Sequence, residues 1–128
     1  MIWFMIALQS FVSVQPEKLD IRRPIACMFR LGQYIDPQER TSEDNSRPLK
    51  WRFSEIGPTS ARFESAGEAG NALPYFHSGG KGLSLTIRQQ NGIQLFTVWT
   101  NGEAYWTKHT VVGSSTGSQQ FRGLCVNN

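Results

Sequence analysis

The chain has 128 residues, a formal net charge of +3 and 39% hydrophobic residues. This length suits one domain with a real hydrophobic core and is rarely enough for two. The 13 Lys and Arg residues are spread along the chain, whereas nucleic-acid binders usually concentrate them on one face or tail. We therefore exclude a nucleic-acid partner.

The first fourteen residues, MIWFMIALQSFVSV, carry no charge and are mostly apolar. Such a run is too short to cross a bilayer as a helix, so we expect no stable membrane span, but it suits the hydrophobic region of a signal peptide. We predict a signal peptide or apolar leader over residues 1–15 and a periplasmic or secreted protein. The alternative is a cytoplasmic protein in which residues 1–14 form a buried strand or helix of the fold.

The rest of the chain divides into a linker and one β-domain. Residues 16–24 are polar and bounded by prolines, which predicts a linker, and residues 25–128 are predicted to be a single domain. Residues 36–48 are charged, Pro-bounded and suited to a surface loop. Short runs typical of strands occupy residues 25–31, 49–56, 61–65, 71–77, 83–112 and 118–126. Pro74 predicts that residues 71–77 form an edge strand.

The segment from Leu83 to Val112 organises the fold, because it contains three β runs separated by Asn91-Gly92 and Asn101-Gly102. Asn-Gly is the preferred pair of two-residue hairpin turns. The first turn predicts that Leu85 pairs with Val98, and the second predicts that Val98 pairs with Tyr105. Seven or eight strands with such turns indicate an all-β fold, an antiparallel sandwich or a small barrel.

Because side chains alternate along a strand and paired residues share a face, this register divides the meander into two faces. The predicted core face carries Leu83, Leu85, Ile87, Phe96, Val98 and Tyr105. The predicted second face carries Ser84, Thr86, Arg88, Leu95, Thr97, Trp99, Ala104, Trp106 and Lys108.

Aromatic and basic side chains gather on this second face. Indole rings beside cations can stack on sugars or bind an acidic partner. We interpret Arg88, Trp99, Trp106 and Lys108 as a candidate binding surface for a glycan, an acidic protein or a small ligand. The alternative is that the face is packed inside the protein, since large aromatic side chains are usually mostly buried.

Two cysteines, Cys27 and Cys125, lie near the two ends of the predicted domain. In an exported protein they suit one disulfide, and in a reducing cytosol they would be incidental thiols. A third interpretation makes Cys27 a nucleophile with His77 or His109 as its base.

The end of the chain contains NGEAYWTKHTVV followed by SQQFRGLC, with Gly102, Ala104, Tyr105, His109, Phe121, Gly123 and Cys125 at the recurring positions. This pattern resembles small uncharacterised exported β-proteins of alphaproteobacteria, over about the last third of the chain. The resemblance implies export, an all-β fold and a disulfide between Cys27 and Cys125. It implies no activity.

The sequence contains no HExxH motif, no CxxC motif and no phosphate-binding loop. With only two histidines, we expect no metal site and no cofactor. We predict a non-enzymatic binding or inhibitor module. The alternatives are a structural or envelope-associated protein without a small-molecule site and, third, a small hydrolase.

Overall fold

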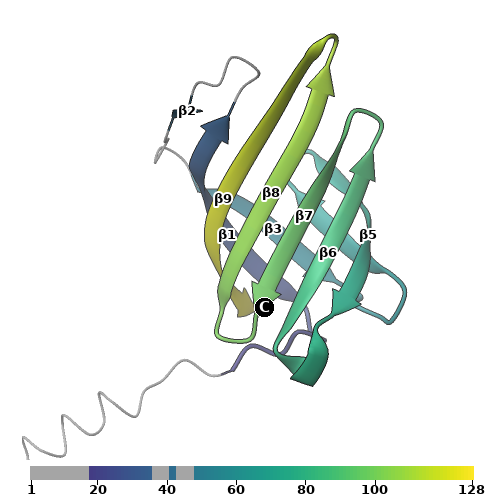
Figure 1. Ribbon diagram of the computed structural model, residues 1–128. Coiled ribbons are helices and arrows are strands. Elements are labelled where there is room, and N and C mark those ends of the chain that lie inside the picture. The colour runs from purple at the N-terminus through teal and green to yellow at the C-terminus, as the bar shows by residue number, and fades with distance from the viewer. Residues whose placement is uncertain (1–17, 36–40, 43–47) are drawn as a thin grey trace, which may run out of the picture.

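The computed structural model describes residues 18–35, 41–42 and 48–128, which form an antiparallel β-barrel (Figure 1). The described residues contain no α-helix, and the predicted all-β fold is confirmed as a barrel. The elements in chain order are β1 (Ile25–Ile35), β2 (Thr41–Ser42), β3 (Leu49–Ser54), β4 (Ala61–Ser65), β5 (Glu68–Phe76), the short 3₁₀ turn η1 (Ser78–Gly80), β6 (Gly82–Gln89), β7 (Gly92–Trp99), β8 (Glu103–Val112) and β9 (Ser115–Asn127).

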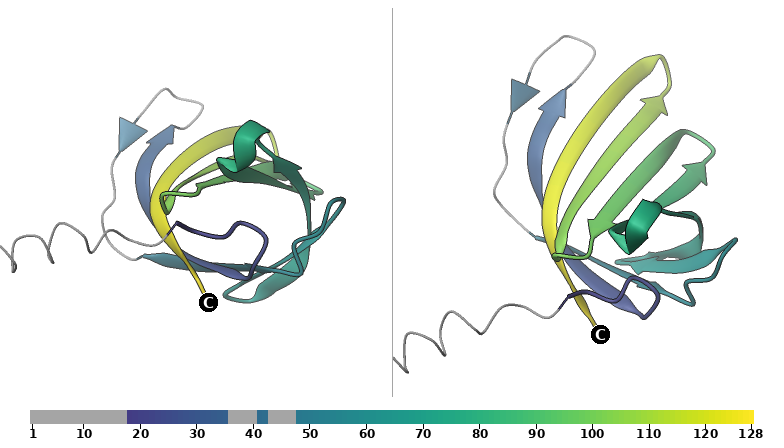
Figure 2. Two further views of the ribbon diagram at one scale, coloured as in Figure 1. Left: turned by 90° about the horizontal axis from the view of Figure 1, so that it is seen from below. Right: turned by 60° about the horizontal axis from the view of Figure 1, so that its bottom comes forward.

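Every barrel strand pairs with its neighbour along the chain, and β9 pairs with β1 to close the ring. Eight strands form the ring, which Figure 2 shows from below, and β2 lies outside it, paired among the described residues with the end of β1. At the closing seam Cys27 lies directly opposite Cys125. The two cysteines form a disulfide, as the resemblance implied, so Cys27 has no thiol to act as a nucleophile.

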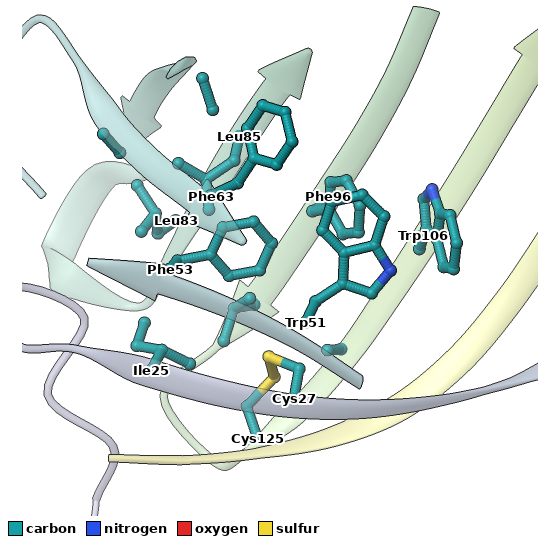
Figure 3. Close-up of a cluster of buried hydrophobic side chains, with 14 of the residues drawn as sticks. Ile25, Cys27, Trp51, Phe53, Phe63, Leu83, Leu85, Phe96, Trp106 and Cys125 are labelled. Carbon is teal, nitrogen blue, oxygen red and sulfur yellow. A yellow bond between two sulfur atoms is a disulfide. The ribbon is translucent and has the colours of Figure 1, made fainter. Parts of the chain in front are cut away.

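The barrel interior is filled by side chains that alternate inward along the strands. Leu83, Leu85, Ile87, Phe96 and Val98 are all buried, as predicted for the core face. An aromatic cluster fills the centre, and Figure 3 shows its side chains converging from opposite walls. The ring of Trp106 stacks on Phe96 with centroids 5.1 Å apart and on Phe121 at 3.9 Å. The middle of the barrel is therefore a packed core.

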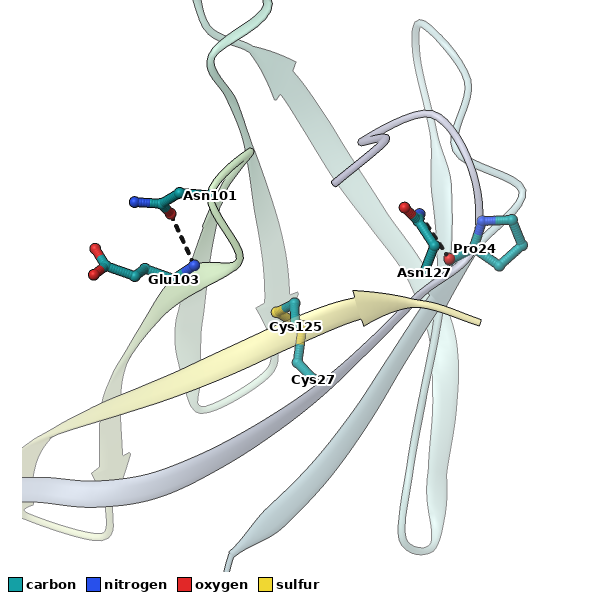
Figure 4. The surroundings of a disulfide bond; sticks show 6 residues. All are labelled: Pro24, Cys27, Asn101, Glu103, Cys125 and Asn127. Carbon is teal, nitrogen blue, oxygen red and sulfur yellow. Dashed lines mark hydrogen bonds between the residues drawn. A yellow bond between two sulfur atoms is a disulfide. The ribbon is translucent and has the colours of Figure 1, made fainter. Parts of the chain in front are cut away.

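One end of the barrel is closed by residues 18–24, which precede β1 (Figure 2). Leu19 and Ile21 are only 6% and 7% exposed. The Leu19 amide donates to the carbonyl of Thr100 at 2.8 Å, and the Asn127 side-chain amide donates to the Pro24 carbonyl at 3.2 Å (Figure 4). The described part of the predicted linker is therefore part of the fold. The predicted signal peptide, residues 1–15, lies outside the described residues, as do 36–40 and 43–47 of the predicted surface loop.

The β6–β7 hairpin differs from its predicted register by two residues. Gln89 pairs with Gly92, so the turn is Gln90-Asn91 rather than Asn91-Gly92, and Leu85 pairs with Phe96. A displacement of two residues preserves the face on which each side chain lies. This is why the predicted core positions of β6 and β7 are buried although the predicted pairs are wrong.

The β7–β8 hairpin differs from its predicted register by one residue, which exchanges the faces of β8. Val98 pairs with Ala104, because the connection contains three residues, Thr100 to Gly102, instead of two. Of these three residues only Gly102 has a positive φ, at 93°, which suits a three-residue loop that ends in a left-handed residue. Ala104 is therefore buried, and Tyr105, predicted in the core, is 44% exposed.

Pro74 is accommodated because β5 changes partners along its length. β4 pairs with β5 as far as Ala72, and β6 pairs with β5 from Leu73 to Phe76. At Pro74 the strand therefore has a paired neighbour on one side only, and the missing N–H breaks no ladder. The predicted edge strand is wrong for β5 as a whole but correct for this local position.

No helix among the described residues is long and apolar enough to cross a membrane.

Candidate functional site

The four residues predicted as a binding surface do not share a face. Arg88 and Trp99 lie on the outer wall, whereas Trp106 and Lys108 point into the barrel because of the one-residue change in the β8 register. Trp106 is 4% exposed and belongs to the core. The predicted aromatic-basic face is therefore wrong as a grouping, and the alternative of a packed position is correct for Trp106.

Trp99 has a structural role on the outer wall. It pairs with Gly82, and a Cβ at that glycine would lie 2.5 Å from the indole ring. The indole thus packs on the bare backbone of β6, which stabilises glycine in a strand.

A serine and a histidine meet beside Trp99. His77 Nε2 and Ser84 Oγ are 2.8 Å apart, and Ser84 Oγ is also 2.8 Å from the hydroxyl of Thr97. This spacing suits a nucleophile and its base, but Ser84 is only 9% exposed. We interpret the chain of hydrogen bonds as a structural network. Among the described residues no group of three His, Cys, Asp or Glu side chains could hold a metal ion.

The inner face of the barrel changes from apolar to polar toward the end opposite residues 18–24. In register, Phe96 lies beside Trp106 in the core, Gln94 lies beside Lys108 one step further on, and Gly92 lies beside Thr110 in the last row. Lys108 in turn pairs with Gln119 of β9. Two residues along each strand therefore replace the aromatic rings of Phe96 and Trp106 by an amide and an ammonium group, and two residues further along β8 lies the hydroxyl of Thr110.

These side chains surround a hollow of about 360 Å³, which we call the mouth. Inward-facing residues of β5, β6, β8 and β9 contribute to it, together with the β6–β7 turn. The β8–β9 hairpin extends beyond the β6–β7 hairpin and forms a taller wall on one side (Figure 1). Among the described residues the lining contains one carboxylate, one ammonium, three amides and one hydroxyl, from Glu68, Gln89, Asn91, Lys108, Thr110 and Gln119.

A buried hydrogen-bond chain connects the mouth to the aromatic core. The indole N–H of Trp106 donates to Gln94 Oε1 at 3.0 Å, and Gln94 Nε2 donates to Gln89 Oε1 at 3.0 Å. Gln94 is 2% exposed, and none of the described buried polar side-chain atoms lacks a partner. A fully satisfied network of this kind holds its members in one arrangement. Gln89 is therefore held in place as part of the lining.

Gly92 pairs with Thr110 where β7 and β8 approach each other closely at the end of the barrel. A Cβ at this position would lie 2.3 Å from the carbonyl oxygen of His109, a distance that no side chain can adopt. Close approach of β7 and β8 thus requires glycine here. A backbone hydrogen bond also holds β8 against the β6–β7 turn, since the Val111 amide donates to the Asn91 carbonyl at 2.7 Å.

The fold and this site define a small disulfide-bonded barrel with one closed end and one open, polar end. No protein-family model matches this chain, and neither a curated protein nor a solved structure matches it. Sequence reasoning identified Lys108 but placed it with the wrong neighbours. It missed five other lining residues, Glu68, Gln89, Asn91, Thr110 and Gln119. The signal that could have found them is a polar residue at an inward-facing position near the end of a strand.

Proposed function

We propose that this protein is a non-enzymatic binding protein that takes a small polar molecule in the mouth of its barrel. The observation that carries the proposal is the convergence of six polar side chains on a hollow of about 360 Å³ above a packed aromatic core. This volume lies at the small end of the range of about 300–1,000 Å³ that is typical of ligand pockets. Small barrels of eight strands can hold one small ligand.

The chemistry of the lining indicates the class of ligand. Glu68 and Lys108 carry opposite charges, and the other lining groups of the described residues are neutral donors and acceptors. A ligand without net charge, either a zwitterion such as a free amino acid or a neutral polyol such as a monosaccharide, satisfies such a lining. A strongly charged or fully apolar ligand would leave a polar group unpaired, which costs binding free energy.

We also propose that the protein is exported to the periplasm or secreted. Two features support this: the disulfide between Cys27 and Cys125, because disulfides persist in oxidising compartments, and the resemblance of the C-terminal segment to exported β-proteins. Fractionation of cells followed by N-terminal sequencing tests the proposal. We expect soluble protein outside the cytoplasm that starts after the apolar leader, and unprocessed protein in the cytosol would contradict it.

The binding proposal is tested by isothermal titration with free amino acids and monosaccharides as probes. Gln119 points into the mouth, and its neighbour Gln120 is exposed on the outer wall, so Gln119→Leu and Gln120→Leu form a matched pair. We expect Gln119→Leu to weaken binding about tenfold, the cost of one hydrogen bond to a polar ligand, and Gln120→Leu to leave it unchanged.

A second matched pair tests the charge in the mouth. Lys108→Met removes an ammonium group of the lining, and Lys81→Met makes the same change at an exposed position beside η1. Binding of an amino acid is expected to fall in the first variant only. If no probe binds the wild-type protein, or if both members of each pair behave alike, the protein is better described as a structural barrel without a small-molecule site.

A further inference from the structure

Two arginines lie directly opposite each other on the outer wall of the barrel. Arg30 of β1 pairs with Arg122 of β9, and both are exposed. Like charges at directly paired positions destabilise a sheet. The acid nearest in register is Glu103, which pairs with Leu124 rather than with Arg122, and no carboxylate of the described residues forms an ion pair with either guanidinium.

A hollow of about 450 Å³ lies at this arginine pair, where β3 begins beside β1. We call it the outer groove, and it is lined by Met28, Arg30, Pro48, Arg122, Gly123 and Leu124. Its apolar side chains are open to solvent, since Met28 is 43% and Leu124 is 67% exposed. Lys50, which pairs with Met28, adds a third cation to the same wall. The groove thus combines exposed apolar surface with concentrated positive charge.

We propose that the outer groove binds a single anionic amphiphile, a molecule with a phosphate or carboxylate head on an alkyl body. Guanidinium groups bind such heads through paired hydrogen bonds, and two opposed arginines offer two planar forks to one head. The alkyl body then covers Met28 and Leu124. Such a ligand also relieves the repulsion between Arg30 and Arg122. The concave shape and the volume of the groove favour one molecule over the flat surface of a bilayer.

The test is isothermal titration with decyl phosphate below its micelle concentration. Ethyl phosphate is the control that keeps the phosphate head without the long alkyl chain. Decanol is the control that keeps the alkyl chain without the charged head. We expect decyl phosphate to bind the wild-type protein at least about tenfold more tightly than either control, because each lacks one half of the interaction. Equal binding of decanol would overturn the anionic part of the proposal.

Matched variants locate the site. Arg122→Gln is expected to weaken decyl phosphate about tenfold or more, and Arg88→Gln, an exposed arginine on β6 across the barrel, is expected to change nothing. Leu124→Ser should weaken decyl phosphate but not ethyl phosphate, with Leu95→Ser on the outer face of β7 as its control. Unchanged urea midpoints confirm that each variant is folded.

Two further measurements distinguish binding in the outer groove from binding in the mouth or on a bilayer. Gln119→Leu in the mouth should not alter decyl phosphate binding, so failure at one site is distinguishable from failure at the other. Vesicles containing phosphatidylglycerol test a bilayer as the source of the anion. The proposal would be overturned if the protein sedimented with vesicles but did not bind monomeric decyl phosphate. It would also be overturned if Arg88→Gln and Arg122→Gln lost the same affinity for decyl phosphate.

Discussion

The indole N–H of Trp106 donates a 3.0 Å hydrogen bond to the side chain of Gln94, on the neighbouring strand β7. Both residues are buried, and the bond lies where the aromatic core ends and the polar mouth begins. A buried amide at this depth is costly unless it is fully paired. The bond therefore allows Gln94 to support Gln89 without destabilising the barrel.

Gln94→Leu leaves the indole N–H without its acceptor, so we expect the free energy of unfolding to fall by about 1–3 kcal/mol. Urea denaturation of the wild type, both single variants and the Gln94→Leu/Trp106→Phe double variant measures the coupling. In the Trp106→Phe background the same change at Gln94 should cost less, by about 1 kcal/mol. Equal costs in both backgrounds would show that the bond contributes nothing.

The orientation of β8 is tested by placing lysine at adjacent positions. Ala104 is 1% exposed and faces the interior, whereas Tyr105 is 44% exposed on the outer wall. Ala104→Lys should destabilise the protein by about 3 kcal/mol or more, because it overpacks the core and buries an unpaired charge. Tyr105→Lys should cost less than about 1 kcal/mol. If Tyr105→Lys instead had the lower urea midpoint, Tyr105 would face the interior, and Asn101-Gly102 would form a two-residue turn.

The closure of the barrel by residues 18–24 predicts a stability cost at its buried residues. Leu19→Ala should lower the free energy of unfolding by about 2–3 kcal/mol through loss of apolar contacts and the cavity left behind. Lys18→Ala, at the neighbouring exposed position, should change it by less than about 0.5 kcal/mol. Thermal and urea unfolding check both values, and equal midpoints for the two variants would mean that this segment is a linker after all.

The bridge between Cys27 and Cys125 joins residues 98 positions apart in sequence. Constraining an unfolded chain over such a distance stabilises the folded state by about 4–5 kcal/mol in the chain-entropy model. We expect reduction to lower the urea midpoint of the wild-type protein markedly. The Cys27→Ala/Cys125→Ala variant should not respond to reductant. Titration of two free thiols in protein purified without reductant would contradict the bridge.

The strand content of the fold and much of its core could be predicted from the sequence because alternation is local. The predicted core positions Leu85 of β6 and Phe96 of β7 are correct although the predicted turn is wrong, since a displacement of two residues leaves each side chain on the same face. The predicted face of β8 is wrong because an Asn-Gly pair can form either a two-residue turn or the end of a three-residue loop, and Asn101-Gly102 forms the second. Which loop forms depends on packing between Trp106 and the rest of the core.

The mouth could not be predicted, because it depends on closure of the barrel as well as on register. Glu68 of β5 and Gln119 of β9 line the same hollow only because β9 pairs with β1 and completes the ring. Single-strand alternation cannot specify this meeting. Similarly, the polar composition of residues 16–24 concealed Leu19 and Ile21, two isolated apolar residues that become buried only because the barrel has an end to fill.

The most direct test of the central claim is an amide NMR titration of isotope-labelled protein with the amino-acid and monosaccharide probes. Side-chain amide signals report on the mouth itself, since Gln89, Asn91 and Gln119 all line it. We predict saturable shifts at these three side chains and at the backbone of Glu68 and Lys108. Shifts confined to the outer wall, or none at saturating probe, would contradict a ligand site in the mouth.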